Sequence, residues 1–394
     1  MPTSSKPDNK LYFENLDGLR FFCFLSVFFF HSFITDDPAI TAAPIYHFIK
    51  VSLFGNGFLG VNFFFVLSGF LITYLLIKEK MTNNFINIPN FWMRRVLRIW
   101  PLYFVCVFYG FVIFPFTKIF AGGVPNETAN PWLYLSFLSN FDSIYHGLPD
   151  AIGLGVLWSV AVEEQFYLTW PLILFFFPVN KFWMPLCFIL AGSVVFRAIY
   201  DVPILNELHT LSCIGDMAIG GLGAWLMLQS TSFKHRIYNL PKQAILFIYI
   251  LFVFVFLFRD EFMLSNFWLR ILERPIISGI MLCIILEQCF AKNSFYKMGR
   301  FKWASRLGII TYGLYCLHVF VISVTRGLTK MAGLNTHVWQ VVFLETIVSL
   351  VISIGIGLIS YRFLEAPFLK LKDKFYYGKK DIVQIKNQVV DNQL

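Results

Sequence analysis

The composition of this 394-residue chain is that of a protein buried in lipid, with 57% apolar residues, 14% charged residues and 48 Phe. Soluble domains carry about a quarter charged residues, so the composition excludes a string of water-soluble domains and favours one continuous membrane domain. The net charge of +9 does not indicate a nucleic-acid partner, because the basic residues stand in short clusters between apolar runs, as topology signals do.

The apolar runs predict an all-α, polytopic integral membrane protein with about ten transmembrane helices. A helix needs about 20 mostly apolar residues to cross the hydrocarbon core. The first run follows a polar head and lacks a small-residue cleavage site, so we expect it to be retained as a span. The approximate spans are 17–35, 57–77, 99–116, 152–178, 182–200, 210–229, 243–258, 270–290, 308–326 and 339–364.

Lys and Arg are distributed unevenly between the loops on the two sides. If the N-terminus is cytoplasmic, the inner segments hold dense clusters, such as 78–98 and 292–306, and the outer segments hold scattered cations, such as Lys50. This asymmetry places both termini in the cytoplasm and predicts a multi-pass protein of the cell (inner) membrane. The expected organisation is a cytoplasmic N-terminal segment at 1–14, a transmembrane domain at 15–370 and a basic cytoplasmic tail at 371–394.

The first span carries three polar residues, Asp17, Arg20 and His31. Arg20 and His31 share a helix face, because eleven residues at 100° each return to within about 20° of the starting direction. Asp17 can pair with Arg20 one turn away. A histidine inside a span is costly unless it faces protein or water, so His31 is a functional candidate. The alternative is a snorkelling arginine and a packing histidine with a satisfied hydrogen bond.

Three arginines stand within one helical turn after the second span, and we call them the arginine cluster (Arg94, Arg95 and Arg98). Aromatic residues flank them on both sides. Guanidinium groups at a membrane surface suit a phosphate-rich ligand, because each presents a fork of donors to phosphate oxygens. The alternative is that these charges only set the topology.

Two adjacent carboxylates, Glu163 and Glu164, interrupt the fourth span. Carboxylates inside a membrane are costly unless they are protonated, paired or exposed to water, which favours a functional or network role. Glu163 and Tyr167 are four residues apart and are expected to face one site.

Other polar residues inside apolar runs are weaker candidates. Ser68, beside Gly69, indicates a close packing point between helices. His318 in the ninth span could act as a relay or could be a packing histidine. The seven cysteines form no CxxC pair and no Cys/His metal spacing, so we expect no metal site.

Five motifs stand in one order along the chain. They are LDGLR at 16–20 followed by His31, then 60–72, 94–103, 158–167, and 312–318 with 361–367. In these motifs the chain, from about Asn15 to Lys370, resembles the acyltransferase 3 family, the membrane O-acyltransferases that modify bacterial surface glycans and some secreted metabolites. It departs from the family pattern at Phe21-Phe22-Cys23, where small residues are usual, and at Val160, where Leu is usual.

The resemblance implies a reaction and a role for each candidate residue. The usual donor is acetyl-coenzyme A, a cytoplasmic co-substrate rather than a permanently bound cofactor. The acceptor is a hydroxyl of an extracytoplasmic glycan or lipid-linked saccharide. His31 would deprotonate this hydroxyl or carry the acetyl group, and Arg20 with Asp17 would position the donor. Glu163 would orient His31 or bind the acceptor, while the arginine cluster would bind the donor phosphates. The remaining expected site residues are Trp158, Ser159, Glu164, Tyr167, Ser68 and His318.

Two other kinds of protein also fit the composition. A membrane transporter that exports a glycan or metabolite would have similar spans with charged residues inside them, although no inverted repeat is evident. A catalytically inactive interaction protein is the second alternative, and the presence of Arg20, His31 and Glu163 argues against it. The acceptor, the acyl group and the oligomeric state are left open. Membrane lipids are the other expected partners, with the basic tail as a contact to the lipid surface.

Overall fold

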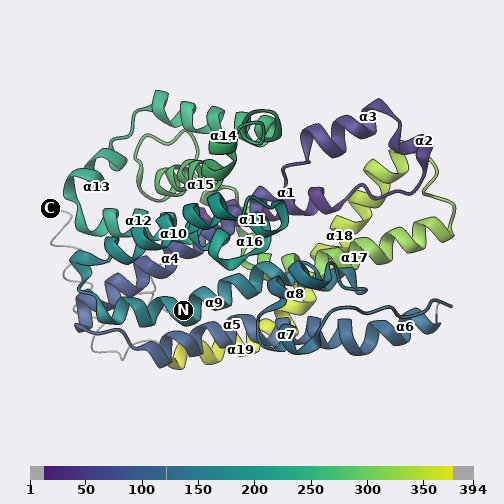
Figure 1. Ribbon diagram of the computed structural model, residues 1–394, viewed down its shortest axis with the longest axis horizontal. Coiled ribbons are helices and arrows are strands. Elements are labelled where there is room, and N and C mark those ends of the chain that lie inside the picture. The colour runs from purple at the N-terminus through teal and green to yellow at the C-terminus, as the bar shows by residue number, and fades with distance from the viewer. Residues whose placement is uncertain (1–12, 121, 376–394) are drawn as a thin grey trace, which may run out of the picture.

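The computed structural model describes residues 13–120 and 122–375, and this part of the chain is helical without a β-strand. Figure 1 shows most of the long helices running along the longest axis of the molecule in an elongated bundle. The all-α prediction is confirmed for the described residues. The predicted N-terminal segment (1–14) and basic tail (371–394) lie mostly outside them.

Long helices form the bundle, and short helices connect them. Each predicted span overlaps one long helix. The long helices are α1 (Glu14–His31), α4 (Leu59–Asn83), α5 (Ile88–Phe108), α9 (Leu157–Phe176), α10 (Trp183–Ile199), α12 (Thr210–Gln229), α14 (Lys242–Met263), α15 (Phe267–Phe290), α17 (Thr311–Met331) and α18 (Thr346–Ser360). The short ones are α2 (Pro38–Thr41), α3 (Pro44–His47), α6 (Phe114–Phe120), α7 (Pro131–Leu135), α8 (Ser139–His146), α11 (Pro203–Leu208), α13 (Thr231–Tyr238), α16 (Lys302–Ile309) and α19 (Ala366–Leu371).

Single turns of other helix types lengthen or join several of these elements. A π-helical turn leads from α5 into α6, and others flank α18. The π-helical turns are η1 (Phe48–Leu53), η2 (Tyr109–Ile113), η6 (Gln340–Glu345) and η7 (Tyr361–Glu365), and the 3₁₀ turns are η3 (Ile152–Leu154), η4 (Val179–Lys181), η5 (Met298–Arg300) and η8 (Lys372–Phe375).

Fewer helices qualify as membrane spans than the sequence predicts. Among the described residues, 5 helical stretches are long and apolar enough to cross a membrane, or up to 7 if each of two bent pairs is one span. The bent pairs are α13 with α14, at 85°, and α16 with α17, at 78°. The expected number of about ten is therefore not confirmed. The long helices α1, α9 and α15 fall short because charged and polar side chains interrupt their apolar sequence. The 5 stretches are Leu59–Asn83, Ile88–Phe120, Val179–Ile199, Pro203–Gln229 and Gln340–Leu371.

Helix α4 lies at the centre of the bundle and is the most buried of the candidate spans, with 78% of its apolar window inside the protein. Glycines let α12 approach it closely. A Cβ atom at Gly69 would lie 2.0 Å from the carbonyl oxygen of Met217, and one at Gly220 would lie 2.0 Å from that of Val66. Since membrane helices associate through such small residues, the prediction of a close packing point beside Ser68 is confirmed.

The position of α1 follows from two further close contacts. Its first half packs on α16, where a Cβ at Gly308 would lie 2.0 Å from the carbonyl oxygen of Asp17. Its middle packs on the start of α4, where a Cβ at Gly60 would lie 2.4 Å from the carbonyl oxygen of Cys23. These contacts fix α1 between α4 and the bent α16–α17 pair, with His31 as its last residue.

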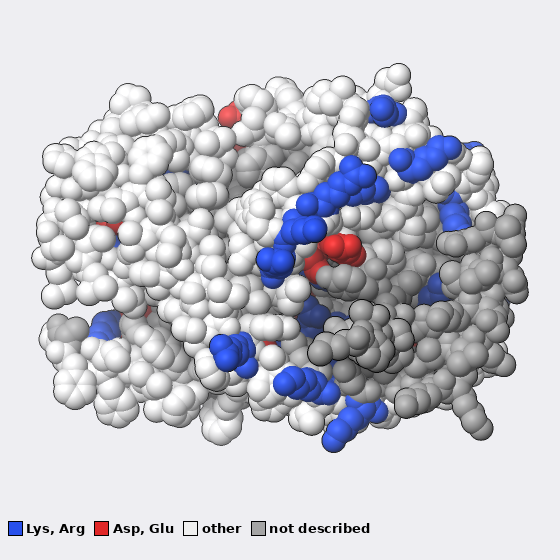
Figure 2. All heavy atoms as spheres, turned by 180° about the vertical axis from the view of Figure 1, so that it is seen from behind, with Lys and Arg blue, Asp and Glu red and all other residues white. Residues whose placement is uncertain are grey.

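Positive charge is concentrated at one end of the molecule. On the face that Figure 2 shows, the Lys and Arg side chains gather toward the end that lies on the left in Figure 1, and most of the other half is uncharged. This is the end where α13 and the start of α5 lie in Figure 1. The distribution agrees with the uneven placement of basic residues among the loops in the sequence.

Candidate functional site

Two histidines from different helices lie side by side near the end of α1. The ring centroids of His31 and His318, on α17, are 5.3 Å apart. His318 is completely buried, and its Nδ1 lies 2.7 Å from the carbonyl oxygen of Tyr315. Because a carbonyl oxygen can only accept, Nδ1 donates and Nε2 of the neutral ring carries a lone pair. That Nε2 has no hydrogen-bond partner among the described residues, so it is available to a proton or a donor.

Aromatic rings enclose His318. The ring of Phe24 meets it edge-on at 5.7 Å between centroids, and those of Phe28 and Tyr315 lie at 6.3 and 5.8 Å. The hydroxyl of Tyr315 is 2.7 Å from Ser159 Oγ on α9. Ser159 thus joins α9 to the turn of α17 that carries His318.

Trp158 also packs α9 against α4, since its ring meets that of Phe65 edge-on with 6.0 Å between the centroids. Together with Ser159 it fixes α9 against α4 and α17. Of these two expected site residues, Ser159 contacts the turn of α17 beside His318 and Trp158 contacts α4.

Glu163 lies in a triangle of hydrogen bonds. Its Oε1 accepts from Ser68 Oγ at 2.8 Å, and its Oε2 accepts from the Tyr167 hydroxyl at 2.8 Å. Tyr167 and Ser68 are themselves 3.0 Å apart. The predicted pairing of Glu163 with Tyr167 on one face is confirmed. Within the described part of the chain, these hydrogen bonds of Glu163 reach α4 and its own helix rather than His31.

The arginine cluster does not act as one unit, because its members have different neighbours. Arg94 is buried, with Nη2 at 3.5 Å from Glu79 Oε2 and Nη1 donating to the Phe375 carbonyl at 2.8 Å. The guanidinium of Arg95 lies 5.5 Å from the centroids of the Phe91 and Tyr167 rings. Arg94 thus ties the chain after α19 to α5, while Arg95 lies beside the Glu163 triangle.

Arg98 faces two carboxylates. It lies close enough to Glu163 and to Glu365, in η7, for their charges to interact. Its side chain is partly exposed. Of the three arginines it is the one whose neighbours connect the Glu163 triangle with the C-terminal helices.

Glu164 points to a different neighbour from Glu163. Its Oε2 accepts from Trp100 Nε1 at 2.9 Å, and its buried Oε1 has no hydrogen-bond partner among the described residues. The ring of Trp100 packs on that of Phe137, with 5.3 Å between the centroids. The two adjacent carboxylates therefore serve two different environments.

The predicted ion pair on α1 is present. Arg20 Nη1 lies 2.5 Å from Asp17 Oδ1, and Asp17 is buried. Arg20 is also near the thiol of Cys289, at the end of α15. The pair thus occupies the first half of α1, below the histidine that ends the helix.

Lys50 is a residue of this site that the sequence analysis missed. From η1, its Nζ donates to the carbonyl oxygens of Phe30 at 2.9 Å and Ser32 at 2.7 Å. These are the neighbours of His31 on both sides. The signal was its isolation, since it is the one Lys or Arg between the first two predicted spans.

A buried network of charges was also missed. Asp216 of α12 pairs with Arg274 of α15 at 2.7 Å and accepts from Ser278 and Asn62 at 2.8 and 3.1 Å. Beside it, Glu273 pairs with Arg259 at 2.5 Å and with Arg197 at 3.6 Å. All of these residues except Arg259 stand inside predicted spans, so the criterion that singled out His31 would have found them as well.

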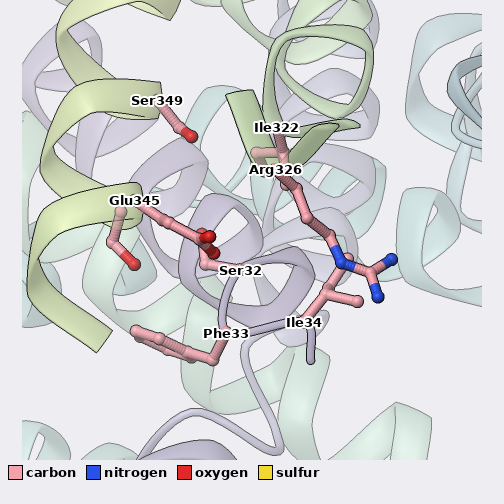
Figure 3. Close-up of a pocket in the computed structure, with 8 residues that line it drawn as sticks. Ser32, Phe33, Ile34, Ile322, Arg326, Glu345 and Ser349 are labelled. Atoms are coloured by element: carbon pink, nitrogen blue, oxygen red, sulfur yellow. The ribbon is translucent and has the colours of Figure 1, made fainter. Parts of the chain in front are cut away.

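A small hollow opens directly after His31 (Figure 3). Its cavity volume is about 10 Å³, which is about the space for one water molecule. Figure 3 shows Glu345 and Ser349 on one side of it and Arg326 on the other. Arg326 hydrogen-bonds to Asp36 at 2.6 Å and holds the pKa of that carboxyl below its usual range. The lining residues are Ser32, Phe33, Ile34, Ile322, Arg326, Glu345, Thr346 and Ser349.

Comparison with known proteins adds a family to this geometry. The chain is 26% identical over 406 residues to the peptidoglycan O-acetyltransferase OatA of Listeria monocytogenes, covering 94% of this chain and 59% of the relative. It is 26% identical over 389 residues to the O-acetyltransferase OatA of Staphylococcus aureus, covering 91% of this chain and 57% of the relative. The chain thus spans less than three-fifths of the length of these relatives. No solved structure matches.

A family model also matches the chain. The model described as an acyltransferase domain, that of the acyltransferase 3 family, matches residues 13–362. This range runs from the start of α1 through α18 into η7 and contains both histidines, the Glu163 triangle and the arginine cluster. With the motifs in their order and the model matched over nearly all of the described helices, the chain belongs to the acyltransferase 3 family.

Proposed function

We propose that this protein is a membrane O-acetyltransferase that moves an acetyl group from cytoplasmic acetyl-coenzyme A to a hydroxyl of a glycan outside the membrane. The observation that carries the proposal is the pair of facing histidines within the acyltransferase domain. Two relatives bear the name O-acetyltransferase, and one of them is named for peptidoglycan. Peptidoglycan is therefore the first acceptor to test.

The orientation that we propose places the basic end of the bundle on the cytoplasmic side of the cell membrane, with both termini in the cytoplasm. Loops rich in Lys and Arg remain on the cytoplasmic side during insertion. Helix α1 then begins inside, with Asp17 and Arg20 in its inner half, and ends toward the outer face at His31. In this arrangement the donor enters at the arginines and the acceptor arrives beside the hollow next to His31.

In the proposed reaction His31 is the general base. It takes the proton of the acceptor hydroxyl while the oxygen attacks the thioester carbonyl, and the carbon–sulfur bond breaks as the ester forms. The proton then passes to the departing thiolate, which leaves as the free coenzyme A thiol. General-base help of this kind contributes about 10²–10⁴-fold, so positioning of the two substrates must supply much of the remaining acceleration.

The neighbours of His31 support this role. Lys50 holds the carbonyl groups on either side of it, which fixes the end of α1. The lone pair on His318 Nε2 lies next to it and can accept a proton or a hydrogen bond. Arg98 and Arg95 lie near the Glu163 triangle and offer guanidinium groups to the donor phosphates, whereas Arg94 is engaged with Glu79.

The test uses the full-length protein in isolated membranes with acetyl-coenzyme A labelled in the acetyl group. We expect His31→Ala to abolish transfer of label to cell-wall glycan while the protein inserts and accumulates normally. His47→Ala is the matched control, because His47 is exposed in α3, and it should retain transfer. Near-normal labelling by His31→Ala would remove His31 from the mechanism. Glycan export without any label, even in the wild type, would favour the transporter.

A further inference from the structure

A second hollow lies at the basic end of the bundle, between α12, α13 and α15. Its cavity volume is about 310 Å³, within the range of small-molecule sites. Met227 and Phe290 supply an apolar inner wall, and Lys234 and His235 stand exposed at its rim. None of the residues in the candidate active site lines it. We call this hollow the α13 pocket.

Helix α13 has the character of a helix that lies along a membrane surface. It makes an angle of 85° with α14, so it runs nearly in the plane of the membrane when α14 crosses it. Phe233 and Ile237, one turn apart, pack on the apolar core. Lys234, His235 and Arg236 are exposed. Its apolar face is thus held by the protein, and its basic outer face is left to meet anionic lipid headgroups.

Lys234 lines the α13 pocket, and two further lysines, Lys78 and Lys292, lie near residues that line it. Lys78, near the end of α4, is close enough to Lys234 for their charges to repel. Lys292, just after α15, places its Nζ 5.3 Å from the centroid of the Tyr238 ring, and Tyr238 lines the pocket. Within 13–120 and 122–375, no Asp or Glu forms a salt bridge with any of these three lysines. An anion in the pocket would relieve this repulsion.

We propose that the α13 pocket binds the phosphate headgroup of an anionic phospholipid from the surrounding leaflet. Ammonium groups of Lys234 and Lys292 and the hydroxyl of Thr231 would meet the phosphate, and the glycerol end of an acyl chain would lie on Met227 and Phe290. The apolar wall and the placement of α13 along the membrane surface favour a lipid over a soluble phosphate. Basic pockets between helices on the cytoplasmic side bind anionic lipids in this way. The site would anchor α13 independently of the transfer reaction.

The test measures lipid retention by native mass spectrometry. Purified full-length protein is offered phosphatidylglycerol and phosphatidylcholine with matched acyl chains in equal amounts. The wild type should retain phosphatidylglycerol in preference. The double variant Lys234→Gln/Lys292→Gln should lose about tenfold or more of that preference, because each lysine near the surface contributes substantially to attraction of an anionic headgroup.

The matched control is Lys181→Gln/Lys302→Gln, which removes the same charge from exposed positions that do not line the pocket. It should behave as the wild type, and both double variants should elute as single species of native size. Equal retention of the two lipids by the wild type, or equal retention by the two double variants, contradicts the proposal. Release of phosphatidylglycerol by millimolar inorganic phosphate would identify a soluble-phosphate site instead and also overturn it. Since the readout is binding, its failure leaves the acetyl-transfer proposal untouched.

Discussion

At the scale of single residues, Lys50 places a positive charge at the carbonyl end of α1, where helix carbonyls lack partners within the helix. Its ammonium bonds the carbonyls on both sides of His31. A cation in such a place stabilises a helix by about 0.3–1 kcal/mol at an exposed site. Its greater effect is on the orientation of the His31 imidazole, because it fixes the last turn of the helix that carries this ring.

We therefore expect Lys50→Met to lower kcat by about tenfold or more while the KM for acetyl-coenzyme A changes little. The measurement is a kinetic assay of label transfer with purified protein. Lys50→Arg keeps a cation in reach of the two carbonyls and should recover a large part of kcat. A proportional loss of active protein with an unchanged kcat would show instead that Lys50 serves only stability.

The arginine cluster gives a second prediction at this scale, because its members differ in their partners. Arg98→Gln should raise the KM for acetyl-coenzyme A several-fold, since Arg98 is partly exposed and the ion pair with Glu79 belongs to Arg94. Arg94→Gln should mainly lower the melting temperature, because it leaves the buried Glu79 carboxylate without its guanidinium, a loss of about 3–5 kcal/mol for buried pairs. If Arg94→Gln raised the KM and left the melting temperature unchanged, the assignment of the two roles would be reversed.

At the scale of elements, the crossing of α4 and α12 depends on glycine. A Cβ at Gly69 would meet the Met217 carbonyl, a backbone atom that cannot rotate away. Gly355, on α18, has open space around its missing Cβ. The two positions are both helical glycines and differ in what surrounds them.

Gly69→Ala should destabilise the protein by about 1–3 kcal/mol, as overpacking does, and Gly355→Ala should leave stability unchanged or slightly raised. Thermal unfolding in detergent compares the two. Equal melting temperatures for the two variants would mean that the helices can separate at this crossing without cost.

Helix positions could be predicted from the sequence where apolar runs decide them, and each predicted span overlaps a long helix. The ends could not. The helix expected from residue 99 begins at Ile88, because its first turns are the amphipathic, basic stretch, which continues the helix outside the apolar run. The π-helical turns at η2, η6 and η7 leave no mark on the apolar pattern.

The contacts of the candidate site also fall into those that the sequence predicts and those that it does not. Pairs within one helix, Asp17 with Arg20 and Glu163 with Tyr167, follow from spacing alone and are present. Contacts between helices do not follow from spacing, so the partners of Arg94 and the approach of His318 to His31 appear only in the fold. Whether these residues act in catalysis stays a prediction.

At the scale of the whole molecule, the buried charges behind α12 hold four long helices and the start of α4 together. Asp216 alone contacts α4 through Asn62 and α15 through Arg274 and Ser278. Glu273 extends the connection to α10 and α14 through Arg197 and Arg259. Ion pairs removed from water in this way are costly to break on one side only.

Asp216→Asn should therefore lower stability by about 3–5 kcal/mol, as loss of one partner of a buried pair does. The double variant Asp216→Asn/Arg274→Gln should recover part of this loss, because it leaves no lone charge. Unfolding temperatures of four proteins, the wild type, Asp216→Asn, Arg274→Gln and the double variant, form a double-mutant cycle. Additive losses in that cycle would show that the two side chains do not act as a pair.

The narrow hollow beside His31 bears on whether the donor is hydrolysed by water instead of reacting with the acceptor. It has room for about one water molecule, and rings of Phe24, Phe28 and Tyr315 enclose the neighbouring His318. A thioester held beside the hollow in the proposed reaction would meet little water while it waits for an acceptor. Shielding of this kind suppresses hydrolysis of reactive groups, so in the proposed reaction it would limit loss of the donor when no acceptor is bound.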